Sequence, residues 1–285
     1  MKHAYLILAH DEFGLLQTLI GCLDDGRNDI FVHIDRKVKA MPELKAEKAG
    51  LQVLEKRIDI RWGDVSMVEA EYALFEAAAA KGPYRYYHLL SGVDLPLKSQ
   101  DYIHRFFEEH AGKEFVGYTL TEMTPEVGRR MQRWHLFSRH FSRRRNCYSV
   151  FRALGIRLQE VLGIQRNRDI DFKKGSQWVS ITDGLVRWLL EKKLWAMKTF
   201  SHTFVPDECF VQTLVWMSPL RKNLYDTRED GTGCMRAIGW RGCELVDWSA
   251  SDLDELAVSS ALFARKFNSS DPDFIQKIVS LSAQV

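Results

Sequence analysis

The stretch Tyr5-Leu6-Ile7-Leu8-Ala9 is a continuous apolar run that ends at once in His10-Asp11-Glu12. An apolar run of this length without alternation is typical of a buried strand in a parallel sheet. Residues 13–23 follow with apolar side chains at helical spacing, and a second apolar run, 30–34, ends in Asp35-Arg36-Lys37. The order strand, helix, strand predicts a βαβ unit and therefore an α/β fold, in which ligands bind beyond the carboxyl ends of the strands.

The rest of the chain continues this alternation. We expect further strands at 86–90, 114–119, 177–182 and 235–240, and further helices at 67–80, 100–110, 184–200, 207–216 and from 249 onward. Ser66 is the expected N-cap of the helix at 67–80, and Ser249 with Asp252 resembles a capping box. No repeat, low-complexity tract or linker rich in Pro or Gly interrupts the chain, so we expect a single domain over 1–285.

Composition excludes several classes of protein. The chain has 285 residues, of which 46% are hydrophobic, enough to bury a large core. Its net charge of +2 gives no global attraction to nucleic acid. The five cysteines are odd in number and lack CxxC spacing, which argues against a zinc knuckle or a disulfide framework and favours a reducing compartment. The first apolar run is too short for a signal peptide or a membrane anchor, so we expect a cytoplasmic location.

Residues 129–168 differ in character from the rest. They contain eleven arginines and a single acid, Glu160, interleaved with aromatic side chains. This composition predicts a basic insertion or a helical subdomain laid over the sheet. Two interpretations stay open: a basic face that contacts an anionic membrane, and a solvated helical face with a few core aromatics.

Four stretches deliver acids and bases where apolar runs end. They are His33-Ile34-Asp35-Arg36-Lys37, Ser91-Gly92-Val93-Asp94-Leu95-Pro96, Pro206-Asp207-Glu208 and Ala264-Arg265-Lys266-Phe267. In this order they resemble the core-2/I-branching β-1,6-N-acetylglucosaminyltransferase family of glycosyltransferases, which also contains peptide O-xylosyltransferases. The resemblance extends from Tyr5 to Lys277 and is weak between Thr119 and Lys174. Because no anchor is evident, the chain looks like a bacterial-type member.

The resemblance implies an architecture and a reaction. The architecture is a GT-A-like glycosyltransferase fold with a Rossmann-like central mixed sheet flanked by helices. Residues 1–120 would form a nucleotide-binding half and 121–285 an acceptor-binding and catalytic half. The reaction is inverting, metal-independent transfer of a sugar, with N-acetylglucosamine expected and xylose as the alternative, from a UDP-sugar to a hydroxyl of a glycan acceptor.

Glu208 is the candidate catalytic base. From spacing alone, an acid at this place is an ordinary residue of a helix N-terminus, where the helix dipole favours a carboxylate. The Pro-Asp-Glu motif reverses this interpretation, because the glutamate of the motif is the catalytic base of the resembled family. Asp207 is then expected to be a cap.

Lys266 is the candidate partner of the donor diphosphate, together with an upstream arginine. Arg236 matches that arginine best, and Arg241 is its rival. Basic side chains take the place of a cation in the resembled family, so no metal or other cofactor is expected. The three Asp-x-Asp tripeptides, at 169–171, 252–254 and 271–273, follow no early strand and are interpreted as caps or solvated acids.

The remaining candidates contact the nucleoside or the acceptor. Asp35, Trp62 and His10 are expected at the uracil and ribose, although a lone Asp after a strand is more often a turn-former. For the acceptor we expect Asp94 in its Gly-x-Asp-x-Pro loop, a stacking residue Trp178, and the basic residues Arg130 and Arg133. A half-buried strand aromatic is an equally good interpretation of Trp178.

The sequence also bears on two rival functions. A dinucleotide enzyme would carry Gly-x-Gly-x-x-Gly after the first strand, and this chain does not. A catalytically inactive carbohydrate- or nucleotide-binding protein on the same fold is the second rival, against which the presence of both Glu208 and Lys266 speaks. The expected role is in bacterial surface polysaccharide synthesis, with an acceptor that can be lipid-linked and peripheral contact with the inner face of the plasma membrane.

Overall fold

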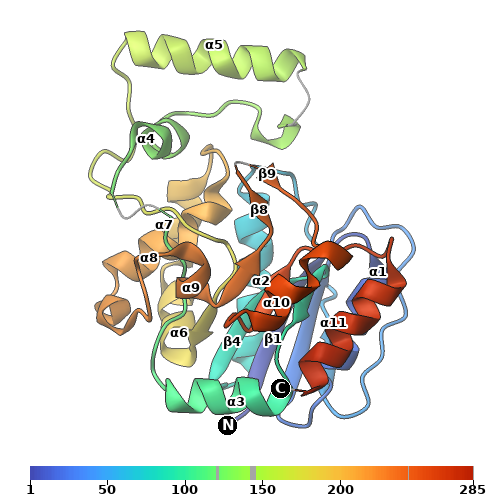
Figure 1. Ribbon diagram of the computed structural model, residues 1–285. Coiled ribbons are helices and arrows are strands. Elements are labelled where there is room, and N and C mark those ends of the chain that lie inside the picture. The colour runs from blue at the N-terminus through green and yellow to red at the C-terminus, as the bar shows by residue number, and fades with distance from the viewer. Residues whose placement is uncertain (120–121, 142–145, 243, 285) are drawn as a thin grey trace.

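A mixed central sheet organises the molecule. The computed structural model describes residues 1–285 except 120–121, 142–145, 243 and 285 (Figure 1). The sheet has the strand order β3-β2-β1-β4-β6. Its strands are β1 (His3–Ala9), β2 (Asn28–Ile34), β3 (Gly50–Val53), β4 (Tyr86–Ser91) and β6 (Ser180–Thr182). The first four run parallel and β6 is antiparallel to β4, which confirms the predicted α/β class with a mixed sheet flanked by helices.

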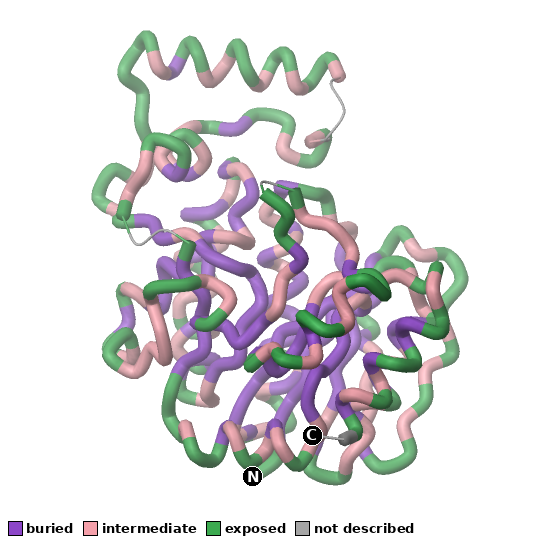
Figure 2. The backbone as a smooth tube through the Cα atoms, in the orientation of Figure 1, coloured by how far each residue is buried: buried purple, intermediate pink, exposed green. Residues whose placement is uncertain are grey.

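Strand β1 is buried along its whole length and divides the core in two. Because side chains alternate along a strand, Ala4, Leu6 and Leu8 enter one core. That core also receives α2 (Ser66–Lys81), α6 (Asp183–Glu191) and α8 (Phe210–Met217). Tyr5, Ile7 and Ala9 enter the other core, where α1 (Phe13–Cys22), α3 (Gln100–Glu109) and α11 (Pro272–Gln284) pack. Figure 2 shows the buried strands enclosed by more exposed helices.

A second sheet brings distant parts of the sequence together. It has the order β5-β10-β7, from β5 (Asp94–Pro96), β10 (Phe263–Arg265) and β7 (Arg236–Ile238). Arg265 pairs with Asp94 in the antiparallel register, and Phe263 pairs with Arg236 in the parallel one. A short hairpin of β8 (Trp240–Arg241) and β9 (Glu244–Leu245) follows. The remaining turns and helices of this half are η3 (Pro219–Asn223), α9 (Asp230–Cys234), η4 (Ala250–Asp252) and α10 (Leu253–Val258).

Residues 125–161 form a helical layer at one end of the molecule. It comprises α4 (Pro125–Met131), η1 (Ser138–His140) and α5 (Cys147–Val161). Figure 1 shows this layer at the end opposite the N-terminus, with α5 outermost. Since β1 starts near the N-terminus, its carboxyl end points toward the layer. In the described part of the chain, no helix combines the length and the apolar character needed to cross a bilayer.

Several expected elements differ in the structure. The helix expected at 184–200 is two helices, α6 and α7 (Lys193–Phe200), which meet at Lys192. The helix expected from 207 starts at Phe210, after the 3-10 turn η2 (Pro206–Glu208).

The predicted caps have mixed outcomes. Ser66 is the first helical residue of α2 and not its N-cap, which is Val65, and its backbone N–H donates to the Asp64 carboxylate at 3.1 Å. The capping box of Ser249 and Asp252 is confirmed, and it opens η4.

A close approach of three glycines explains why no regular strand forms at 114–119. Phe115 makes a single bridge to Ser180, after which Gly117 packs against other backbone segments. A Cβ on Gly175 would lie 1.9 Å from the Gly117 carbonyl oxygen, and one on Gly233 would lie 3.2 Å from the Gly117 Cα. We call Gly117, Gly175 and Gly233 the glycine contact. Only residues without a side chain allow these three segments to come so near.

We predict that Gly175→Ala lowers the free energy of unfolding by at least about 3 kcal/mol, because a methyl group would overlap backbone that cannot rotate away. Urea denaturation of parent and variant measures this difference. Gly21→Ala, near the end of α1 with open space around the position, is the matched control and should raise the free energy of unfolding by up to about 1 kcal/mol. A Gly175→Ala variant as stable as the parent would show that the glycine contact does not constrain the fold.

Candidate active site

Glu208 ends the turn η2 and is partly exposed. Val205, in the left-handed region at φ 54°, turns the chain into η2. The Glu208 carboxylate Oε2 accepts a hydrogen bond from Arg130 Nη1 at 2.8 Å, and Lys174 Nζ lies 3.9 Å from the same oxygen. The backbone carbonyl of Glu208 accepts from the Gly175 amide at 2.9 Å. The carboxylate is therefore held next to two cations, and the turn that carries it is hydrogen-bonded to Gly175 of the glycine contact.

A second carboxylate shares these cations. Glu126 Oε1 lies 2.8 Å from Arg130 Nη2 and 3.2 Å from Lys174 Nζ. Arg130 thus bridges two acids, one on its own helix α4 and one on η2. The ion pair with Glu208 ties the helical layer to the rest of the molecule at the candidate base. Lys174 was not predicted from the sequence, although it directly precedes Gly175.

Two further acids, the half-buried Asp207 and the fully buried Glu71, accompany Glu208. Burial, reinforced by the negative charge of Glu208, raises the pKa of Asp207 to about 7. Burial likewise raises the pKa of Glu71 well above its ordinary value, with Asp207 as a further cause. Glu71 Oε1 accepts from Gln177 Nε2 at 2.8 Å, whereas Glu71 Oε2 and Asp207 Oδ1 have no hydrogen-bond partner among the described residues.

The expected role of Asp207 as a cap is not what the structure has. The N-cap of α8 is Cys209, and no side chain caps that helix within the described residues. Asp207 is half-buried in η2, and its Oδ1 is enclosed near Glu71 without a hydrogen bond to the backbone of α8 among the described residues. Sequence alone gave no signal of Glu71, which lies inside a helix rich in Ala and Glu.

Asp94 and Trp178, both predicted at the acceptor, are joined by Arg265. The buried Asp94 Oδ1 accepts from Arg265 Nε at 3.2 Å, and its Oδ2 accepts from the Ser91 amide at 3.0 Å. The Arg265 guanidinium lies 4.2 Å from the centre of the Trp178 ring, a stacking distance for a cation on an aromatic face. Trp178 is only 7% exposed and lies in the segment that leads into β6. Arg265 was missed because its neighbour Lys266 carries the motif.

Arg236 is turned into the core. Its guanidinium donates to Cys234 O at 2.6 Å, to Val179 O at 3.1 Å and to Ser180 Oγ at 3.0 Å. The side chain is 2% exposed, and burial lowers its pKa. In this position it binds protein carbonyls, and a diphosphate could reach it only by displacing them. The structure therefore does not support Arg236 as the donor arginine.

Lys266 and Arg241 each contact Trp248. Lys266 Nζ is 2.8 Å from Asp247 Oδ1, and the Lys266 carbonyl accepts from the Trp248 amide at 2.9 Å. The guanidinium of Arg241 is 5.2 Å from the Trp248 ring centre and pairs with Asp252 at 2.8 Å. Both cations are partly exposed, so an anion in solution can approach them. Of the two rival arginines, Arg241 is the one that is partly exposed and that, like Lys266, contacts Trp248.

The predicted nucleoside residues follow the carboxyl ends of β1 and β2. His10 is exposed, with Nε2 3.2 Å from Asp11 Oδ2. Asp35 is buried and accepts from the Lys37 amide at 2.8 Å and from Lys37 Nζ at 2.6 Å. The structure thus gives Asp35 the turn-forming role that its position after a strand indicates, and a nucleoside would have to share that carboxylate.

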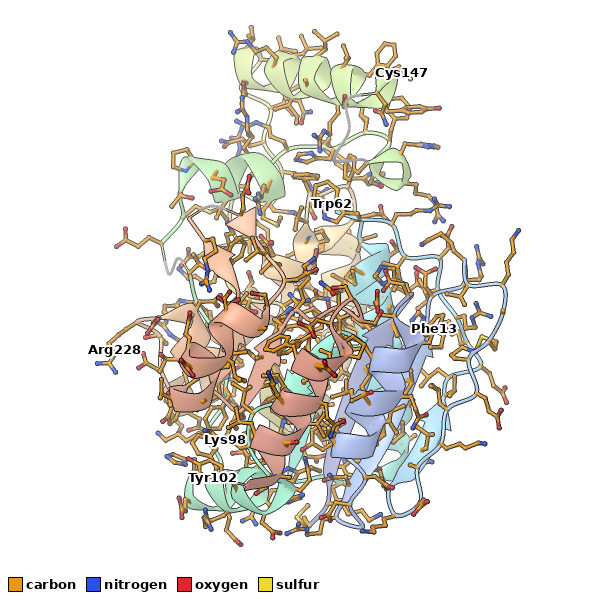
Figure 3. All side chains as sticks on the ribbon, turned by 45° about the vertical axis from the view of Figure 1, so that its right-hand side comes forward. Phe13, Trp62, Lys98, Tyr102, Cys147 and Arg228 are labelled. Carbon is orange, nitrogen blue, oxygen red and sulfur yellow. The ribbon has the colours of Figure 1, made fainter. Side chains whose placement is uncertain are left out.

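Trp62 lies at the boundary between the main body and the helical layer, as Figure 3 shows. It is 42% exposed and meets Phe204 edge to face at 5.5 Å between ring centres. Phe204 also lies under the guanidinium of Arg152 from α5, at 4.3 Å. Arg133 donates to Gln132 O at 3.2 Å, and no contact among the described residues links it to Glu208.

The Asp-x-Asp tripeptides behave as expected where their contacts are visible. Asp171 pairs with Lys173 at 2.6 Å, Asp252 completes the capping box, and Asp271 accepts from the Phe274 amide at 2.9 Å. Among the residues that the structure describes, no three His, Cys, Asp or Glu side chains are grouped so that they could hold a metal ion.

Known proteins resemble this chain over nearly its whole length. The family model described as Core-2/I-Branching enzyme matches residues 3–278. The chain is 23% identical to N-acetyllactosaminide beta-1,6-N-acetylglucosaminyl-transferase of Homo sapiens, over 93% of this chain and 67% of the human protein. It is 22% identical to a xylosyltransferase of Ciona intestinalis, over 95% of this chain and 32% of that protein, and 21% identical to xylosyltransferase 2 of Rattus norvegicus, with 94% and 32% covered.

The chain thus spans about two thirds of the human relative and about one third of the xylosyltransferases. The matched region contains every candidate residue described above. From the extent of this match we conclude that the chain belongs to the Core-2/I-branching enzyme family, a family of glycosyltransferases.

Proposed function

We propose that this chain transfers a sugar from a UDP-sugar to a hydroxyl group of a glycan acceptor, by an inverting and metal-independent reaction on a GT-A-like fold. The observation that carries the proposal is the position of Glu208. Its carboxylate is partly exposed on a fixed turn beside two cations, in a chain of the Core-2/I-branching family. N-acetylglucosamine is the proposed sugar, and the xylosyltransferase relatives make xylose the alternative.

Glu208 is proposed as the general base. The acceptor hydroxyl would donate its hydrogen bond to this carboxylate and attack the anomeric carbon from the face opposite UDP, which inverts the configuration. Arg130 already donates to Glu208 Oε2 at 2.8 Å, so it would have to share the carboxylate with the acceptor. This supports Arg130 as an acceptor contact, with Asp94, Arg265 and Trp178 as a separate wall of the acceptor site.

The departing UDP carries charge that grows as the glycosidic bond breaks, and fixed cations stabilise it. Lys266 and Arg241 are the proposed cations, because both are partly exposed around Trp248. His10, Asp35 and Trp62 are proposed near the nucleoside, where the carboxyl ends of β1 and β2 meet.

A catalytically inactive binding protein is the second candidate function. Release of free sugar from UDP-sugars by the purified chain would exclude it. A role in bacterial surface polysaccharide synthesis, a lipid-linked acceptor, and a location in the cytoplasm or on the inner face of the plasma membrane remain parts of the proposal.

We predict that Glu208→Gln lowers turnover by about a hundredfold to ten-thousandfold while UDP binding is kept, because an amide preserves the shape but cannot accept the proton. Steady-state kinetics and calorimetric titration with UDP measure the two effects. Glu126→Gln is the matched control: it removes the other carboxylate on Arg130 and Lys174, and turnover should change by less than about tenfold. Near-normal turnover in Glu208→Gln would remove this residue from the mechanism.

Substitution of the two rival arginines is expected to change different properties, UDP binding for Arg241 and stability for Arg236. Lys266→Ala and Arg241→Ala should each weaken UDP binding by about tenfold to a hundredfold, the loss expected for a charged hydrogen bond, with stability unchanged. Arg236→Ala should instead lower the free energy of unfolding, because it removes a buried side chain that donates to Cys234 O, Val179 O and Ser180 Oγ. UDP titration and urea denaturation of all three variants separate these effects.

Addition of EDTA to the same assays should change neither UDP binding nor turnover. Activity that is lost on chelation and restored by Mn²⁺ would contradict the metal-free mechanism. A folded Arg236→Ala variant that no longer binds UDP would return the diphosphate role to Arg236.

Asp207 gives a prediction about pH. Its raised pKa of about 7 means that the folded chain keeps a proton which the unfolded chain loses near pH 4. The free energy of unfolding therefore falls as pH rises from about 4 to about 7, and the full cost is present above pH 7. Urea denaturation at pH 5 and pH 8 measures the free energy of unfolding of Asp207→Asn and of the parent. The variant's value minus the parent's should be larger at pH 8 than at pH 5 by on the order of 2–4 kcal/mol. A constant difference between the two proteins at both pH values would contradict this assignment.

A further inference from the structure

Helix α5 has its polar side toward the protein and its apolar side toward solvent. Five side chains lie within about 100° of the helix circumference. They are Val150 (56% exposed), Phe151 (58%), Leu154 (62%), Leu158 (59%) and Val161 (78%). A surface helix ordinarily buries such a stripe against the core. We call these five residues the outer stripe.

Polar and cationic contacts attach the inner side of α5 to the rest of the chain, while Tyr148 near its start stacks on His140 at 4.3 Å. Gln159 is 8% exposed and bonds both the N–H and the C=O of Trp134, at 2.8 and 3.0 Å. Glu160 accepts from Arg129 Nε at 2.9 Å, and Arg152 stacks on Phe204 at 4.3 Å. The orientation of α5 is therefore fixed by specific contacts on its inner side, and the outer stripe is held away from the core.

The apolar surface continues beyond α5. Phe137 is 47% exposed, and its ring centre lies 5.5 Å from that of Tyr148 and 6.5 Å from that of Phe151. Phe137 has φ 59°, a backbone region that aromatic residues seldom adopt. Leu136, beside it, is 48% exposed. Contiguous apolar surface of this kind marks an interaction site more often than a free surface.

The positive charge of residues 129–168 indicates what covers this apolar surface. Residues 129–168 carry a formal charge of +10, whereas the whole chain carries +2, so the remaining residues carry −8. Arg157 is exposed on the flank of the outer stripe, and Arg139 and Arg168 are exposed on the adjoining segments. An apolar stripe flanked by arginines fits the boundary between acyl chains and anionic headgroups, where arginine extends its charge to the phosphates.

We propose that the outer stripe, with the exposed Arg157 and Arg168 near it, seats this protein on an anionic membrane surface. The proposal does not depend on the transferase activity. It also accounts for the position of the helical layer: Arg130 of α4 reaches Glu208, so the candidate active site lies directly beneath the layer that would contact the membrane.

The test is co-sedimentation with phosphatidylcholine vesicles, with and without about one third phosphatidylglycerol, at low and high salt. The parent should bind the anionic vesicles at low salt and be released at high salt. Leu154→Glu/Leu158→Glu should bind at least tenfold more weakly, and both side chains point outward, so the fold should be kept. Leu194→Glu, at an 87% exposed position of α7, is the matched control and should bind like the parent.

A second variant tests the electrostatic part. Arg143, Arg144 and Arg145 lie outside the described residues, so the variant replaces the described and exposed Arg157 and Arg168 by Ser, which should weaken binding by about tenfold at low salt. Three results would overturn the proposal. They are negligible sedimentation of the parent at low salt, equal losses in Leu194→Glu and the α5 variant, and concentration-dependent dimerisation that the α5 variant abolishes while vesicles bind neither protein.

Discussion

The close approach of backbone at Gly117, Gly175 and Gly233 is the constraint on which the candidate site depends. From Gly175 the chain runs through residues 176–178, and each residue takes on a separate task. The Gly175 amide holds the carbonyl of Glu208, the Ser176 amide donates to the Asp230 carboxylate at 2.7 Å, Gln177 reaches Glu71, and Trp178 lies under Arg265. The four residues 175–178 thus contact both the backbone of the candidate base Glu208 and Arg265 of the proposed acceptor site.

Acids and cations lie close together at the site. Two acids without full hydrogen bonding, Asp207 and Glu71, lie near Glu208, and the cations Arg130 and Lys174 contact its carboxylate. Keeping acids buried is unfavourable for folding above neutral pH, because their charged forms lose hydration. Among the described residues, the one side-chain hydrogen bond to this pair is the one that Gln177 donates to Glu71.

The apolar runs predicted the central sheet well, because a strand buried on both faces leaves an unbroken hydrophobic signature. The strand expected at 114–119 failed, since sequence does not show that Gly117 meets another backbone. The motifs located Glu208 and Lys266, but a three-residue strand such as β7 carries too little pattern to tell whether Arg236 points inward. Arg265, Lys174 and Glu71 became visible only when residues far apart in sequence were brought together in space.

The separation of charge between residues 129–168 and the rest of the chain gives the molecule a large electric dipole. Near a negatively charged plane, the field would turn the basic end inward before contact and push the acidic body outward. Both effects act within about a Debye length, roughly 10 Å at moderate salt. The result is one preferred orientation and one preferred height, so the distance from the plane to the reacting centre would be set by the thickness of the helical layer.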